Sequence, residues 1–112
     1  MSKLTKAAAA ELRRLRIERV RLETLRELAA QDPDAVGLFE KQERLVASID
    51  EALSLLPPIE YRILHAWYLG NSTHPMADML EETGYSEPQI NRFRYAALRS
   101  YAYARALDVR GI

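Results

Sequence analysis

The chain has 112 residues, with 16 Lys/Arg balanced by 16 Asp/Glu, and no cysteine. This length suits one domain with a helical extension, and a cysteine-free chain excludes a disulfide framework and a zinc finger. No apolar run approaches the roughly 18 residues of a membrane span, and the N-terminus lacks the apolar core of a secretory signal. We therefore expect a cytoplasmic protein with no membrane partner.

The net charge of zero hides an uneven distribution. Residues 1–31 hold eight Lys/Arg against four Glu, whereas residues 32–60 hold two against seven acids. After Ser86 there are five arginines against Glu87 and Asp108. The two ends are basic and the middle is acidic, so any nucleic-acid contact would be local rather than driven by a global field.

Residues 3–31 contain no Gly or Pro and predict one long helix. Ile17, Val20 and Leu28 lie off its main apolar stripe and indicate a second contact face. The basic residues suit a solvated face better than an arm touching DNA phosphates. We expect the main stripe to pack within the chain or to form a dimer; it comprises Leu4, Ala8, Leu12, Leu15, Leu22, Leu25 and Ala29.

A second helix is predicted over residues 35–56, after the break at Asp32-Pro33-Asp34. Aspartate can cap a helix, and proline suits the first helical position. The exposed side of this helix is acidic, so it can lie antiparallel to the basic first helix as a hairpin. We expect residues 1–56 to form an N-terminal helical region for oligomerisation.

The prolines at 57 and 58 stop that helix, and residues 57–112 are expected to form a second domain. Ile59 to Leu69 predicts a third helix, in which Trp67 anchors the C-terminal core. The turn-rich residues 70–75 lead into a fourth helix from Pro75 to Thr83.

The firmest local signal is the start of the last helix. Gly84 suits a sharp corner between helices, because glycine tolerates positive φ. Ser86 and Gln89 have the spacing of a capping box, and Pro88 falls in the first turn, where its missing N–H is harmless. A short helix, a tight turn and a second helix beginning at Ser86 are therefore predicted.

The last helix has two chemically different faces. One should be a core stripe of Ile90, Phe93, Ala97, Tyr101 and Ala104. Arg, Asn and Gln on the other face suit base edges and phosphates, which is typical of a recognition helix. The alternative is an ordinary solvated face. The polar side is predicted to comprise Gln89, Asn91, Arg92, Tyr95, Arg99 and Tyr103.

Signals for catalysis are missing from the sequence. His65 and His74 lie in different segments, so a capping or salt-bridge role for His74 is favoured over a metal site. The glycines form no phosphate loop, and no serine or threonine has a nearby histidine base. We expect no enzyme activity, no cofactor and no metal.

The stretches LLPPIEYRILHAWYLGNST and MLEETGYSEPQINRFRYAAL resemble region four of bacterial sigma factors. With the long charged N-terminal half, the chain is more similar to small phage regulators of the ArpU and RinA type. Two departures are a longer loop between Tyr68 and Met79, and Thr83 where the pattern has leucine. The resemblance implies DNA-reading positions at Ser86, Glu87, Gln89, Ile90, Arg92, Phe93 and Arg94.

These observations lead to three hypotheses. The first is a sequence-specific transcriptional regulator, phage or prophage encoded, that binds double-stranded DNA as a homodimer through its N-terminal helix. Gln89, Asn91 and Arg92 would read bases, while Arg94, Arg99 and Ser86 would hold phosphates, with Tyr95 beside them. The second is a small terminase-like packaging protein that forms a ring. The third is a protein-interaction module that docks on RNA polymerase or another partner.

Overall fold

The computed structural model describes residues 2–107, which are helical with no strand among them, as the sequence predicts. None of the described helices is both long enough and apolar enough to cross a membrane. The helices are α1 (Lys3–Gln31), the 3-10 turn η1 (Pro33–Ala35), α2 (Val36–Ser54), α3 (Pro58–Leu64), the π-helical turn η2 (His65–Leu69), α4 (Pro75–Thr83) and α5 (Glu87–Ala104).

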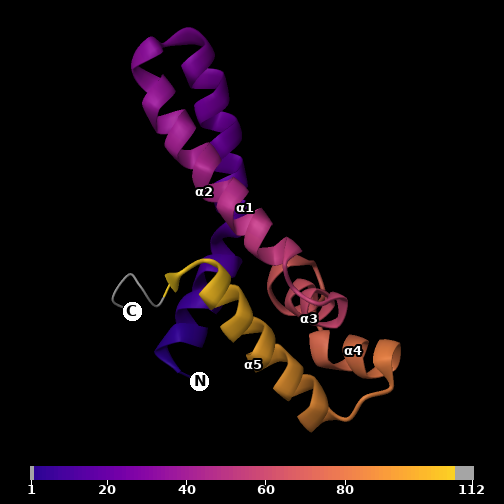
Figure 1. Cartoon of the computed structure of the whole chain (residues 1–112). Coiled ribbons are helices and arrows are strands. Elements are labelled where there is room, and N and C mark those ends of the chain that lie inside the picture. Colours follow the sequence, from indigo (N-terminus) through magenta and orange to yellow (C-terminus); the bar gives the residue numbers. More distant parts are fainter. Residues whose placement is uncertain (1, 108–112) are drawn as a thin grey trace.

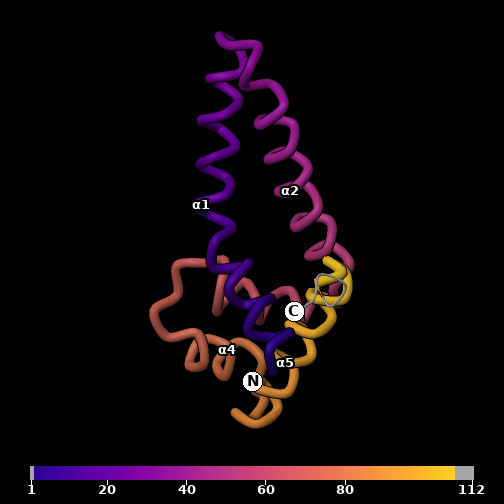
Figure 2. Tube along the Cα trace, turned by 90° about the vertical axis from the view of Figure 1, so that its left-hand side faces the viewer, coloured from indigo at the N-terminus to yellow at the C-terminus, as the bar shows by residue number. Residues whose placement is uncertain are grey.

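Helices α1 and α2 form the predicted antiparallel hairpin, which projects from a body made by α3, α4, α5 and the start of α1 (Figure 1). At its tip, Asp32 Oδ1 accepts a hydrogen bond from the Asp34 amide at 3.0 Å, and Pro33 occupies the first turn of η1. The hairpin makes the molecule elongated, with extents of 53 × 30 × 20 Å (Figure 2).

Opposite charges contribute little to holding the hairpin together. Among residues 2–107, the one ion pair that joins α1 to α2 is Arg19–Asp50, at 2.6 Å and largely exposed, and exposed pairs stabilise weakly. A buried polar contact is more specific: Gln42 Nε2 donates to the Glu18 carbonyl at 2.9 Å. This bond sets the register of the two helices, because a buried amide without a partner is costly.

The larger core lies where three helices meet. The start of α1, the end of α2 and the second half of α5 pack together there, and Leu12, Ile49 and Tyr101 are almost fully buried. This cluster includes residues from both sides of the expected domain boundary at residue 56. The first half of the predicted main stripe of α1, from Leu4 to Leu15, thus packs within the chain.

A smaller core joins α3, α4 and the start of α5. Ile63, Met79 and Ile90 are fully buried in it, and Trp67 packs against it partly buried. The predicted third helix extends to Leu69, but its last turn is a π turn, which the sequence did not indicate. The Gly70 amide closes this turn on the His65 carbonyl at 2.7 Å, and a Cβ on Gly70 would lie only 3.0 Å from the His65 ring.

The predicted core stripe of α5 is partly wrong. Ile90, Ala97 and Tyr101 are fully buried and Phe93 is half-buried, but Ala104 is exposed. Leu98 and Ala102 are buried instead. The reason is that α5 packs against α3 and, farther along, against α1, so its buried face is wider than a single stripe and turns away from Ala104.

Candidate nucleic-acid interface

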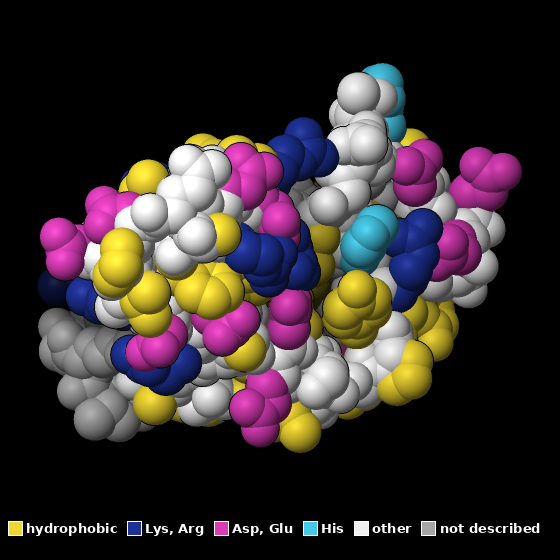
Figure 3. Space-filling model, turned by 90° about the horizontal axis from the view of Figure 1, so that it is seen from above, with side chains coloured by type: hydrophobic (Ala, Val, Ile, Leu, Met, Phe, Trp, Pro, Cys, Tyr) yellow, Lys and Arg dark blue, Asp and Glu magenta, His cyan; other side chains and the backbone are white. Residues whose placement is uncertain are grey.

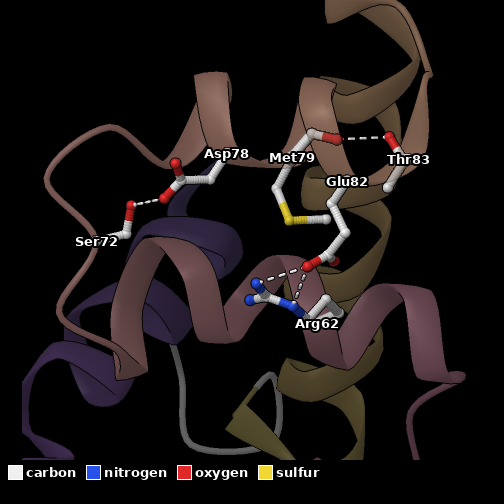
Figure 4. Close-up of polar contacts among 6 residues, drawn as sticks. All are labelled: Arg62, Ser72, Asp78, Met79, Glu82 and Thr83. Atoms are coloured by element: carbon white, nitrogen blue, oxygen red, sulfur yellow. Dashed lines mark hydrogen bonds and ion pairs between the residues drawn. The ribbon is translucent and has the colours of Figure 1, made fainter.

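The turn between α4 and α5 has the tight geometry that its sequence predicts. Gly84 has a φ of 72° and closes the helix through its amide to the Leu80 carbonyl at 3.0 Å. Thr83 Oγ1 donates to the Met79 carbonyl at 2.6 Å (Figure 4) and accepts from the Tyr85 amide at 3.1 Å. At the position where the sigma-like pattern has leucine, the threonine hydroxyl therefore hydrogen-bonds two backbone groups of the turn.

The first turn of α5 is capped as predicted. Ser86 Oγ accepts from the Gln89 amide at 3.4 Å, and Gln89 Oε1 accepts from the Ser86 amide at 2.9 Å. Both side chains are exposed. The capping box uses the Gln89 carbonyl oxygen, so its side-chain NH₂ remains as the donor that can meet a ligand.

An ion pair and a polar contact hold α4 in place. Arg62 of α3 donates to Glu82 through Nη2 at 2.9 Å and Nε at 3.1 Å (Figure 4). Ser72 in the preceding loop bonds to Asp78. With Met79 buried beneath them, these contacts fix the angle between α4 and the body.

Four of the predicted site residues share the outward face of α5. Gln89, Arg92, Tyr95 and Arg99 line one shallow hollow, together with Phe93 and Ala96. Gln89, Arg92 and Arg99 are exposed and Tyr95 is half-buried. Tyr103, 60% exposed, follows at helical spacing. From residue 88 to residue 107 the chain has no acidic residue, so this face carries positive charge alone.

The structure places Arg94 and Asn91 elsewhere. The Arg94 guanidinium lies 4.9 Å from the Trp67 ring centroid and 5.1 Å from that of Tyr95, and it donates to Tyr95 Oη at 3.2 Å. Asn91 is half-buried, with its Oδ1 enclosed and lacking a hydrogen-bond partner among the described residues. Both side chains face the body rather than the hollow lined by Arg92 and Arg99.

Arg105, counted among the basic residues of the C-terminal end, is buried in a polar network. Its Nε donates to Glu11 Oε1 at 2.6 Å, its Nη2 to Glu11 Oε2 at 3.1 Å and its Nη1 to Ser48 at 3.0 Å. Tyr101 also donates to Glu11. The network ties α1, α2 and α5 together. Glu11 and Ser48 are far in the sequence from Tyr101 and Arg105, so no local pattern indicates the network.

Burial and the contacts with Glu11 shift the pKa values of Tyr101 and Arg105 in this network. Desolvation raises the pKa of Tyr101 well above its usual range, and the hydrogen bond to Glu11 and its negative charge raise it further. The hydrogen bond to Glu11 raises the pKa of Arg105. Arg105 therefore stays charged but is neutralised by Glu11, and the exposed positive charge of α5 is that of Arg92 and Arg99.

A second, larger hollow lies beside α1, η2 and the end of α2. Its volume is ≈ 910 Å³, and Arg13, Arg16, Tyr61 and His65 are among its lining residues. The Arg13 guanidinium lies 5.0 Å from the Tyr68 ring centroid, and Arg16 donates to Asn71 Oδ1 at 2.7 Å. The sequence indicated basic residues here but not the hollow, which depends on how the hairpin leaves the body.

Within residues 2–107, no group of three or more His, Asp or Glu side chains is placed to hold a metal ion. Comparison with known proteins identifies no relative: no protein-family model, no curated protein and no solved structure matches this chain.

Proposed function

We propose that the protein binds double-stranded DNA through α4, the Gly84 turn and α5, with α5 as the recognition helix in the major groove. The observation that carries this proposal is the outward face of α5. It presents Gln89, Arg92 and Arg99 on one exposed and acid-free surface, directly after a capped turn. A rigid helix with such a face suits major-groove contacts, in which Arg and Gln bond to base edges.

The base contacts belong to the first turns of α5. Arg92 is exposed and pairs with no carboxylate among the described residues, so its two parallel donors are available for the O6 and N7 acceptors of guanine. Gln89 uses its carbonyl in the capping box, so it donates to a base acceptor rather than making the bidentate adenine contact. We assign sequence reading to these two side chains.

The phosphate contacts belong farther along the same face. Arg99 lies two turns after Arg92 and lines the same hollow, and the Tyr95 hydroxyl can still donate while it accepts from Arg94. Arg94 then orients Tyr95 from a stacked position on Trp67, instead of holding a phosphate itself. Ser86 primarily caps the helix.

The cellular role proposed with this binding is transcriptional regulation, which is what the resemblance to small phage regulators and to region four of sigma factors implies. One recognition helix gives modest affinity, so a regulator of this size needs a second copy on an adjacent half-site. The proposed partners are therefore double-stranded DNA and a second copy of the chain.

Replacing Arg92 with alanine tests the proposed base contact. The variant should bind its preferred duplex more weakly by about 1–3 kcal/mol and discriminate less among sequences. Fluorescence anisotropy with the parent's selected duplex and a scrambled duplex measures both effects. Arg44→Ala, an exposed arginine on α2 remote from α5, is the matched control. Equal affinity of parent and Arg92→Ala for both duplexes would remove Arg92 from the interface.

One observation favours a second candidate, a surface that docks on another protein such as RNA polymerase. Helix α4 carries Asp78, Glu81 and Glu82 and no Lys or Arg. The first helix of a DNA-binding helix-turn-helix crosses the phosphate backbone, where carboxylates are unfavourable. Glu82 is neutralised by Arg62, which leaves Asp78 and Glu81 as the opposing charges. This candidate predicts negligible DNA affinity at low salt.

A further inference from the structure

One face of α1 remains uncovered where the hairpin leaves the body. Ile17, Val20 and Leu28 are 54%, 62% and 46% exposed, and Leu38 of α2, 59% exposed, lies beside them. Ile17, Val20 and Leu38 line one open hollow along the hairpin, with Thr24 and Leu25 between them. The three on α1 lie in one row, and four large exposed apolar side chains close together on a small protein favour a contact with another helix.

The charges along α1 and the tip of the hairpin change sign at the middle of this row. Residues 13–21 hold five arginines against Glu18, whereas residues 23–34 hold Glu23, Glu27, Asp32 and Asp34 against Arg26. Viewed from the tip of the hairpin, acidic, basic and hydrophobic side chains are interspersed (Figure 3). Two copies of this face attract each other when their α1 helices run antiparallel, and repel each other when they run parallel.

We infer that the uncovered face of α1 binds the same face of a second copy, with the two α1 helices antiparallel. The row from Ile17 to Leu28 is centred between residues 22 and 23. A twofold axis at that point sets Ile17 opposite Leu28 of the second copy and Val20 opposite Leu25. Such a contact is isologous and closes on itself as a dimer of two hairpins, a four-helix arrangement.

The same axis fills the basic hollow beside η2. It sets Arg13 opposite Asp32 of the second copy and Arg16 close to Glu27, so the acidic tip enters the space bounded by Arg13 and Arg16. Among residues 2–107, neither arginine has a carboxylate partner: Arg13 stacks on Tyr68 and Arg16 bonds to Asn71. The hollow with unpaired arginines and the exposed acidic tip are thus complementary parts of one surface.

This dimer does not depend on DNA binding, but its geometry affects how two copies could bind DNA together. At a rise of ~1.5 Å per residue, the two copies of Leu12, which lies where α1 contacts the body, are about 32 Å apart along the helices. One turn of DNA is about 34 Å. The dimer therefore separates its two bodies by roughly the spacing of adjacent half-sites.

Light scattering across a concentration series, without DNA, tests the contact. The parent should reach the mass of a dimer, and Val20→Glu should raise the dissociation constant at least about tenfold by burying an unpaired charge. Ala47→Glu, at an exposed position on α2 outside the hollow, is the matched control and should dimerise like the parent. A monomer at every concentration, or a dimer unaffected by Val20→Glu, would overturn the inference.

Disulfide trapping tests the orientation of the two α1 helices, and the native chain has no cysteine that could form a competing cross-link. Ile17→Cys and Leu28→Cys, both at exposed positions, should cross-link efficiently when mixed and poorly when each is oxidised alone. Self-linking of each variant alone would show parallel helices and contradict the inference. Circular dichroism of both variants verifies folding.

A charge reversal tests the proposed ion pairs. Arg16→Glu and Glu27→Arg should each weaken the dimer, and combining both changes in one chain should restore it, because the twofold axis regenerates both pairs. Residues 16 and 27 are too far apart on one helix to pair within a chain. Failure of the double variant to recover affinity would reject this register.

Discussion

Among residues 2–107, Gly84 is the one glycine with a positive φ. Its φ of 72° lies in the left-handed region, where side chains with a Cβ are strained, and no atom lies within 4 Å of an added Cβ. The backbone conformation, rather than a lack of space, therefore favours glycine there. The residue type and its place between two helical patterns made this conformation predictable from the sequence.

Gly84→Ala should lower the free energy of unfolding by about 1 kcal/mol, the cost of left-handed backbone for an L-residue. Gly37→Ala is an informative control, because Gly37 is helical with open space around it and should gain about 0.5–1 kcal/mol from alanine. Urea denaturation measures both. If both substitutions changed the free energy of unfolding equally and in the same direction, the role assigned to the Gly84 turn would be wrong.

Tyr101 should make the protein sensitive to alkaline pH. Its pKa is raised in the folded state, chiefly by burial and then by Glu11, whereas in the unfolded chain it is about 10. Folded Tyr101 keeps its proton when unfolded Tyr101 loses it. This contribution to stability is complete below about pH 10 and is lost as the pH rises above it.

Urea denaturation at about pH 8 and about pH 11 tests this linkage. Tyr101→Phe should be less stable than the parent at the lower pH, since Glu11 loses a donor, but should lose less stability on going to the higher pH. Tyr103→Phe, 60% exposed on the same helix, should behave like the parent. If the parent and Tyr101→Phe lose the same free energy of unfolding between the two pH values, Tyr101 is not the group that causes the alkaline sensitivity.

At the scale of elements, local signals predicted where helices begin and tertiary contacts decided what they expose. Ser86 and Gln89 are three residues apart, so the capping box was visible in the sequence. The orientation of Arg94 was not, because it depends on Trp67, which the fold brings against α5. Ala104 was placed in the core and is exposed for the same reason: α1 and α3 determine the buried width of α5.

The link between α1, α2 and α5 depends on Arg105, and its removal should be costly. Arg105→Met leaves the Glu11 carboxylate without its charged partner and should reduce stability by about 3 kcal/mol. Adding Glu11→Leu should recover part of this loss, because the uncompensated charge is then gone. Arg99→Met, exposed on α5, is the control. If Arg105→Met unfolds at the same temperature as the parent, the network is dispensable.

At the scale of the whole molecule, a projecting hairpin and a body built from α3, α4 and α5 divide the surface into two regions. The all-α class and the hairpin were predictable because both helices are long, periodic and bounded by proline. The hollow between α1 and η2 was not, since it arises from the angle between hairpin and body and from a π turn without a local signature. Net neutrality likewise conceals the acid-free face of α5.

The proposed binding of DNA by this face of α5 is best tested by measuring the affinity for random-sequence duplex DNA across a salt series, by fluorescence anisotropy. We expect micromolar or tighter binding at low salt, and the binding should weaken steeply as salt increases because phosphate contacts release counterions. Arg99→Ala should reduce the salt dependence, since it removes a phosphate contact. No binding by the parent, even at about 50 mM salt, would contradict DNA binding and favour protein docking.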